Sequence, residues 1–166
     1  SKTYAEEIKM PFYGEGLDGL MRSRANSLRG IVNGIDYDEF NPETDPYIVQ
    51  KYNARNFRKE KAKNKKALQE ELGLPVDEKK FMVGIVSRLT DQKGLDLIQG
   101  VMDELCNDNM QLVVLGTGDE RYENMFRHYD WKYHDKVSAQ IYYSEPMSHK
   151  IYAACDAFLM PSLFEP

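Results

Sequence analysis

One short loop carries two cationic side chains, Arg88 and Lys93, between an apolar run and a segment with helical spacing. The apolar run covers residues 81–86, and the helical pattern begins at Gly94. This arrangement puts two positive charges beside the backbone N–H groups of a helix N-terminus, a combination that attracts phosphate groups. Arginine grips two oxygens at once and lysine acts as a point charge, so the pair is suited to stabilise a departing diphosphate. Two solvated loop cations, or an ion pair of Arg88 with Asp91, are the simpler alternatives.

A glycine-rich turn, Gly116-Thr117-Gly118, follows a second apolar run. Glycines at such a turn let the backbone approach a ligand closely. The turn is not the dinucleotide-binding fingerprint, because the position of the third glycine holds Arg121. A nicotinamide-dependent dehydrogenase is therefore disfavoured.

Further polar residues stand where other predicted strands end. Tyr142, Tyr143 and Glu145 form an aromatic and acidic loop suited to a nucleobase and its ribose, although core packing of one tyrosine is an equal alternative. Glu165 follows the last apolar run and, taken alone, is an ordinary surface acid. Asn33 precedes a glycine, a pair that usually means only a tight turn.

The histidines and cysteines do not form a recognisable metal motif. His128, His134 and His149 are scattered, and no group of Cys and His has the spacing of metal ligands, so we expect no bound metal. Cys106 and Cys155 each lie in an apolar pattern. Buried free thiols are expected there, which favours a reducing compartment, the cytoplasm.

The composition is that of an ordinary soluble domain. The 166 residues are 42% hydrophobic and 30% charged, enough for one compact core. A net charge of -5 argues against a nucleic-acid-binding surface. No segment reaches the roughly 18–20 apolar residues of a membrane span, so no membrane contact is expected. The many cations of residues 51–66 indicate the solvated face of a helix.

From residue 58 onward, strand and helix patterns alternate. The strands are predicted at 80–86, 110–115, 137–142 and 157–160, and the helices at 58–72, 95–107, 120–131 and 148–155. This order predicts an α/β fold with a parallel, Rossmann-like sheet, half of a doubly wound domain. Ligands of such sheets bind outside the carboxyl ends of the strands, here the loops 87–94, 116–120, 142–147 and 161–166. A short helix within 16–27 and a short strand at 28–32 are expected before this series.

Six separated segments, in order along the chain, together resemble the bacterial glycogen synthases and starch synthases, glycosyltransferases with two facing Rossmann-like domains. The segments are residues 4–8, 14–20, 30–36, 86–96, 115–119 and 151–166. The resemblance implies transfer of glucose from ADP-glucose to the non-reducing end of an α-1,4-glucan, with retention of configuration. It implies no cofactor beyond the ADP-glucose donor substrate.

The resemblance also assigns residues to roles. Arg88 and Lys93 match the family's diphosphate-binding pair, and Glu165 matches the first acid of its E-x₇-E pattern, so these three are the expected catalytic residues. The expected nucleotide-sugar-binding residues are Asn33, Gly116, Thr117, Gly118, Tyr142, Tyr143 and Glu145.

By the same resemblance, residues 1–40 form an interdomain segment on the donor side, 41–79 a connector and helix, and 80–166 the first part of the nucleotide-sugar-binding domain. The family's N-terminal Lys-x-Gly-Gly loop and its second E-x₇-E acid have no counterpart here. We therefore expect an excised piece that depends on the remaining N-terminal domain of its parent and has little or no activity alone.

Three other functions stay open. A retaining glycosyltransferase that uses a UDP- or GDP-sugar would share the Arg/Lys pair and the glutamate. A non-catalytic nucleotide- or glucan-binding module would use the same fold. A purely structural α/β domain would bind no nucleotide at all.

Overall fold

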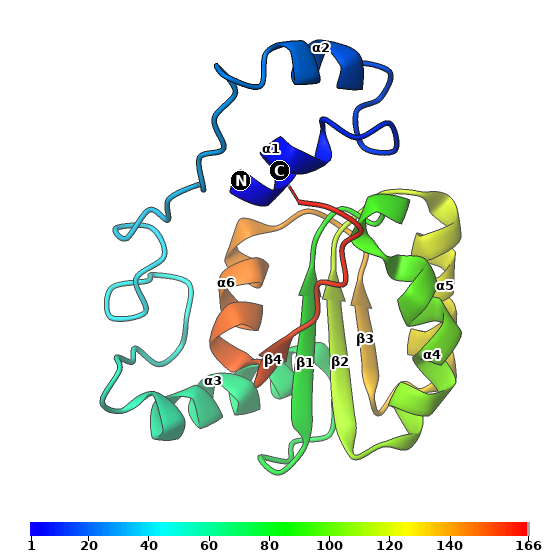
Figure 1. The fold of residues 1–166 in the computed structure, drawn as a ribbon. Coiled ribbons are helices and arrows are strands. Elements are labelled where there is room, and N and C mark those ends of the chain that lie inside the picture. Colours follow the sequence, from blue (N-terminus) through cyan, green and yellow to red (C-terminus); the bar gives the residue numbers. More distant parts are fainter. Residues whose placement is uncertain (166) are drawn as a thin grey trace. The chain divides into compact units, whose positions relative to one another are not determined.

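A parallel sheet of four strands forms the centre of residues 37–162 (Figure 1). In this computed structural model, which describes residues 1–165, the strand order is β3-β2-β1-β4 and every neighbouring pair is parallel. The strands are β1 (Phe81–Val86), β2 (Met110–Leu115), β3 (Val137–Gln140) and β4 (Ala157–Phe158). The predicted α/β fold with a Rossmann-like sheet is confirmed.

Helices cover both faces of this sheet because its strands are apolar on both sides. All six residues of β2 are buried, and they alternate between two cores. Leu112 and Val114 pack in the core under α4 (Leu95–Asn107) and α5 (Glu120–Lys132). Val113 and Leu115 pack in the opposite core with α3 (Phe57–Leu72) and α6 (Glu145–Ala154).

Most predicted boundaries agree with the structure, and the main error lies at the start of α6. The prediction placed that helix at 148–155, whereas it begins at Glu145. The Oγ atom of Ser144 caps it by accepting a hydrogen bond from the Met147 N–H at 3.2 Å, and Pro146 stands in its first turn. Strands β3 and β4 are shorter than predicted. None of the helices in residues 1–165 has the length and apolar character needed to cross a membrane.

Residues 1–36, with the chain end from Leu163, form a separate unit. It contains two short helices, α1 (Lys2–Glu7) and α2 (Asp18–Ser23), the second inside the range predicted for a helix. The strand predicted at 28–32 is wrong: these residues are irregular, and Ile31 and Val32 are exposed. A β-strand needs a neighbouring strand to form hydrogen bonds with its backbone N–H and C=O groups. The described part of this unit contains no strand.

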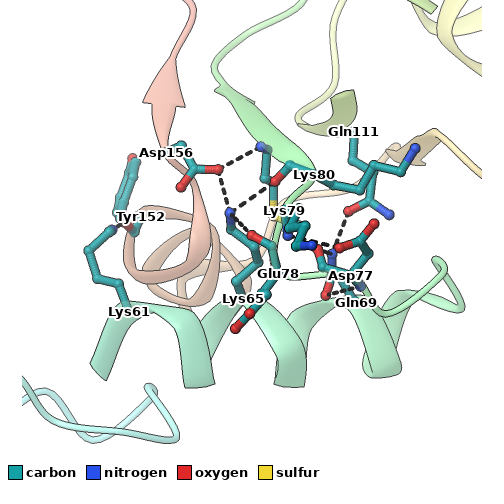
Figure 2. Close-up of polar contacts among 11 residues, drawn as sticks. Lys61, Lys65, Gln69, Asp77, Glu78, Lys79, Lys80, Gln111, Tyr152 and Asp156 are labelled. Atoms are coloured by element: carbon teal, nitrogen blue, oxygen red, sulfur yellow. Dashed lines mark hydrogen bonds and ion pairs between the residues drawn. The ribbon is translucent and has the colours of Figure 1, made fainter. Parts of the chain in front are cut away.

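A polar network fastens α3 to the sheet at the end opposite the ligand-binding loops (Figure 2). The side chain of Lys65 contacts Asp156 at 2.5 Å and the carbonyl of Lys80 at 3.0 Å. The Gln69 amide donates to Gln111 of β2 at 2.7 Å. Lys65 is buried, so the prediction that the cations of 51–66 form a solvated face is wrong at this position.

Candidate functional site

A cavity of about 370 Å³ lies where β1 and β2 end, within the range typical of small-molecule sites. Its walls come from the loops after β1, β2 and β3, the exposed face of α6, and the segment before α3. The lining residues are Glu39, Phe40, Val86, Ser87, Arg88, Leu115, Gly116, Thr117, Tyr142, Tyr143, Ser144, Glu145, Ser148 and Tyr152. Three of the four loops predicted to hold a ligand thus meet at one cavity.

Arg88 is the second residue after β1; it is exposed and lines the cavity. Asp91 accepts hydrogen bonds from Tyr122 and Arg121 instead, so the alternative of an Arg88–Asp91 pair is wrong. The Tyr122 hydroxyl and, next, the Arg121 guanidinium lower the pKa of Asp91. Within residues 1–165 the Arg88 side chain forms no ion pair, which leaves its charge for a ligand.

Lys93 does not line this cavity. It ends a short 3₁₀ turn, η1 (Asp91–Lys93), and the next residue, Gly94, is the N-cap of α4. The predicted arrangement of a lysine beside the N-terminus of this helix is therefore present, while its contact with a ligand stays a prediction.

The two glycines of the 116–118 turn bring the loops after β1 and β2 into contact. A Cβ atom at Gly116 would lie 1.9 Å from the Ser87 carbonyl oxygen, and one at Gly118 would lie 2.3 Å from that of Leu89. The Gly118 N–H donates to the Glu123 carboxylate at 3.0 Å, the main cause of the lowered pKa of Glu123. Gly116 and Thr117 face the cavity, whereas Gly118 serves the packing of the turn.

Both tyrosines of the loop after β3 are exposed and line the cavity, so the alternative that one packs in the core is wrong. Tyr143 is 88% exposed, and the Tyr142 hydroxyl donates to the Gln140 side chain at 2.9 Å. Glu145 follows in the first turn of α6. Exposed aromatic rings beside a carboxylate are suited to stack on a base and to accept hydrogen bonds from a ribose.

Asn33 and Glu165 belong to the unit of residues 1–36 and the chain end, whereas the cavity is formed by the other unit. Both side chains are exposed. Their predicted roles near the donor sugar stay predictions.

Sequence reasoning missed a buried pair beside the cavity, His149 and Asp45. His149 is 2% exposed, and its Nδ1 atom lies 2.7 Å from the Asp45 carboxylate. The ring stacks on Phe40 with centroids 5.0 Å apart. His149 looked isolated in the sequence because its partner, Asp45, lies 104 positions away, in a connector with no recognised motif.

The cysteines are free and buried, as expected, and burial raises the pKa of Cys155 to about 12.

Comparison with known proteins gives consistent matches along the whole chain. The family model described as glycosyl transferases group 1 matches residues 64–166. A glycogen synthase of Lachnospira eligens is 76% identical over all 166 residues, and one of Lachnoclostridium phytofermentans is 69% identical. The catalytic domain of starch synthase IV from Arabidopsis thaliana, bound to ADP and acarbose, superposes on the entire chain with a TM-score of 0.92 at 37% identity. The chain spans about a third of each relative: 35% of the two glycogen synthases and 34% of the starch synthase domain.

Proposed function

Because the chain belongs to the glycosyl transferases group 1 family, we propose that it is the donor-side part of a glycogen or starch synthase. The whole protein would transfer glucose from ADP-glucose to the non-reducing end of an α-1,4-glucan, with retention of configuration. The observation that carries this proposal is the exposed Arg88 in the lining of a cavity that two exposed tyrosines border, at the carboxyl ends of parallel strands. The match of all 166 residues to part of two glycogen synthases supports it.

In this proposal the nucleotide diphosphate occupies the cavity at the end of β1. Arg88 neutralises the charge that grows on the leaving diphosphate as the glycosidic bond breaks, and Lys93 adds a second cation at the start of α4. Tyr142 and Tyr143 pack against the base, and Glu145 accepts hydrogen bonds from the ribose hydroxyls. The ADP bound to the related starch synthase domain supports this choice of nucleotide.

The sugar and the acceptor need residues outside this cavity. We assign Glu165 to the transferred glucose and Asn33 to the donor, as the family resemblance implies. The α-1,4-glucan and the remaining N-terminal domain of the parent are the proposed partners, since the relatives are about three times as long as this chain. A transfer site with one wall missing neither orients two substrates nor excludes water, so these residues alone should have little or no transferase activity.

No cofactor is part of the proposed transfer, and ADP-glucose serves as substrate. We also propose the cytoplasm as the compartment, because two free thiols are stable in a reducing environment.

The test is donor competition in the complete protein, with transfer of labelled glucose to glycogen as the readout. We expect ADP-glucose to support transfer and ADP to inhibit it more strongly than UDP or GDP. Preference for UDP or GDP would assign the protein to another branch of retaining glycosyltransferases. Nucleotide binding without any transfer would identify a binding module instead.

A further inference from the structure

The buried His149 ring has one nitrogen with a partner and one without. Its Nδ1 atom lies 2.7 Å from the Asp45 carboxylate, and a carboxylate only accepts, so Nδ1 carries the proton. In the tautomer with the proton on Nδ1, the lone pair of the ring lies on Nε2. Among residues 1–165 no hydrogen-bond partner reaches this buried Nε2 atom.

Two carboxylates gather at the same ring. Glu145 and His149 are four positions apart on α6, which puts both side chains on one face of the helix. Glu39 arrives from the segment before α3, and one ligand atom from each of the three residues lies within 4.8 Å of the others. A cation bound between the imidazole and the two carboxylates would offset the repulsion between the two negative charges.

We propose that Glu39, Glu145 and His149 bind one divalent ion of the zinc class. Imidazole and carboxylate together are a common ligand set for zinc, whereas magnesium prefers oxygen ligands alone. Bonds of about 2.1 Å in a tetrahedral site set ligand atoms about 3.4 Å apart, so the three ligand atoms, now within 4.8 Å of one another, would draw closer around an ion. Two carboxylates neutralise its charge.

Asp45 supplies the outer support that such sites use. A histidine ligand commonly donates its other N–H to a carboxylate, which fixes the ring and strengthens the ligand nitrogen. The ring is held further by the stacked Phe40 and by Tyr47, whose centroid lies 5.1 Å from that of His149 at an angle of 71°. The imidazole is therefore pre-positioned before any ion arrives.

The ion would sit in the wall of the cavity, since Glu39 and Glu145 line it. Three protein ligands leave one position open toward the cavity, for water or for a bound ligand. The sequence led us to expect no bound metal, because the histidines are scattered and no group of Cys and His has the spacing of metal ligands. The inference does not require the proposed transferase function.

The test is calorimetric titration of the metal-stripped complete protein with zinc chloride alone. We expect one zinc ion per chain and no displacement by excess magnesium. Glu39→Gln and Glu145→Gln should each weaken the site about tenfold or more, and Asp45→Asn about 10–100-fold. Glu43→Gln, an exposed acid on the same segment outside the cluster, is the matched control and should bind like the parent.

Cobalt substitution gives an independent readout, because the visible absorption of bound Co²⁺ reports its ligands and geometry. The band should appear in the parent and in Glu43→Gln and be weaker or shifted in Glu39→Gln, a substitution of an exposed residue. Absence of stoichiometric zinc binding in the parent, or equal binding in Glu39→Gln and Glu145→Gln, would overturn the proposal. These titrations contain no nucleotide, so their outcome is separate from the donor-competition test.

Discussion

The Lys65 ammonium group lies 2.5 Å from the Asp156 carboxylate and thereby joins helix α3 to the residue that precedes strand β4. The same carboxylate oxygen accepts a hydrogen bond from the Met82 N–H of β1 at 2.7 Å. Strand β4 has only two residues in the ladder with β1, so these side-chain contacts supplement a short pairing. One ion pair therefore fixes the strand that leads to the last ligand-binding loop.

Asp156→Ala should destabilise this chain because it leaves the Lys65 ammonium group buried without its counter-charge. Loss of one partner of a fully buried pair costs about 3–5 kcal/mol. The Asp156 side chain is 33% exposed and that of Lys65 8%, so we expect a smaller loss, about 2–4 kcal/mol, in urea unfolding. Glu70→Ala is the control, since its contact with Lys66 is long, 3.8 Å, and exposed; it should cost less than about 0.5 kcal/mol. Equal effects of the two variants would contradict this role of Asp156.

Arg88→Ala and Lys93→Ala, each made in the complete protein, should lower turnover about 10²–10³-fold. Each cation is expected to supply a few kcal/mol of stabilisation to the leaving diphosphate. The measurement is glucose transfer to glycogen at saturating donor. Lys79→Ala removes an exposed cation from the turn before β1, at the other end of the sheet, and should leave turnover unchanged. Parental kinetics in both Arg88 and Lys93 variants would place the phosphate site elsewhere.

Glu165→Gln should reduce turnover more than it reduces affinity for ADP. A carboxylate that acts on the transferred sugar contributes to the transition state, whereas ADP lacks that sugar. Transfer rates and ADP calorimetry on the same preparations separate the two effects. An unchanged rate would make Glu165 a packing residue, and a parallel loss of ADP affinity would move it to the nucleotide.

Stability should fall as the pH rises from about 10 to about 12 because of Tyr122. Burial, and then its hydrogen bond to Asp91, raises the pKa of this tyrosine to about 12. Between the ordinary value and 12, the unfolded chain loses the proton while the folded chain keeps it, so the free energy of unfolding decreases. Urea unfolding at several pH values should show this slope, and Tyr122→Phe should flatten it. The exposed Tyr143→Phe should keep the parental slope; an identical slope in all three proteins would refute the assignment.

The sequence predicted the fold well where local patterns decide it. Helix α4 and strand β2 have the predicted bounds residue for residue, because apolar spacing and a glycine before the helix specify them locally. Prediction from the sequence failed where contacts between residues far apart in the chain decide the structure. The His149–Asp45 pair, the buried Lys65 and the irregular state of 28–32 all depend on contacts, or missing partners, that no local pattern encodes.

The candidate site likewise has one part that the sequence could predict and one part that depends on contacts between distant residues. The carboxyl ends of parallel strands meet by topology, so Arg88, Thr117 and Tyr142 could be brought together from the strand order alone. Phe40 and Glu39 also line the cavity, but they come from the irregular segment before α3, whose path only the folded chain reveals.

Gly94→Ala should destabilise the chain by about 2 kcal/mol or more, measured by urea unfolding. Gly94 has φ +65°, which costs other residues about 1–2 kcal/mol, and its new Cβ would lie 2.0 Å from the Pro161 carbonyl oxygen. That oxygen belongs to backbone, so the loop that carries Arg88 and Lys93 or the loop after β4 must shift. Turnover of the complete protein should therefore fall as well. Gly100→Ala is the matched control on the same helix: its Cβ meets nothing within 4 Å, and a helix-interior alanine should stabilise by about 0.5–1 kcal/mol. Equal stability and activity of Gly94→Ala and Gly100→Ala would contradict this prediction. It would show that the positions of Arg88 and Lys93 do not depend on close packing of their loop against the loop after β4.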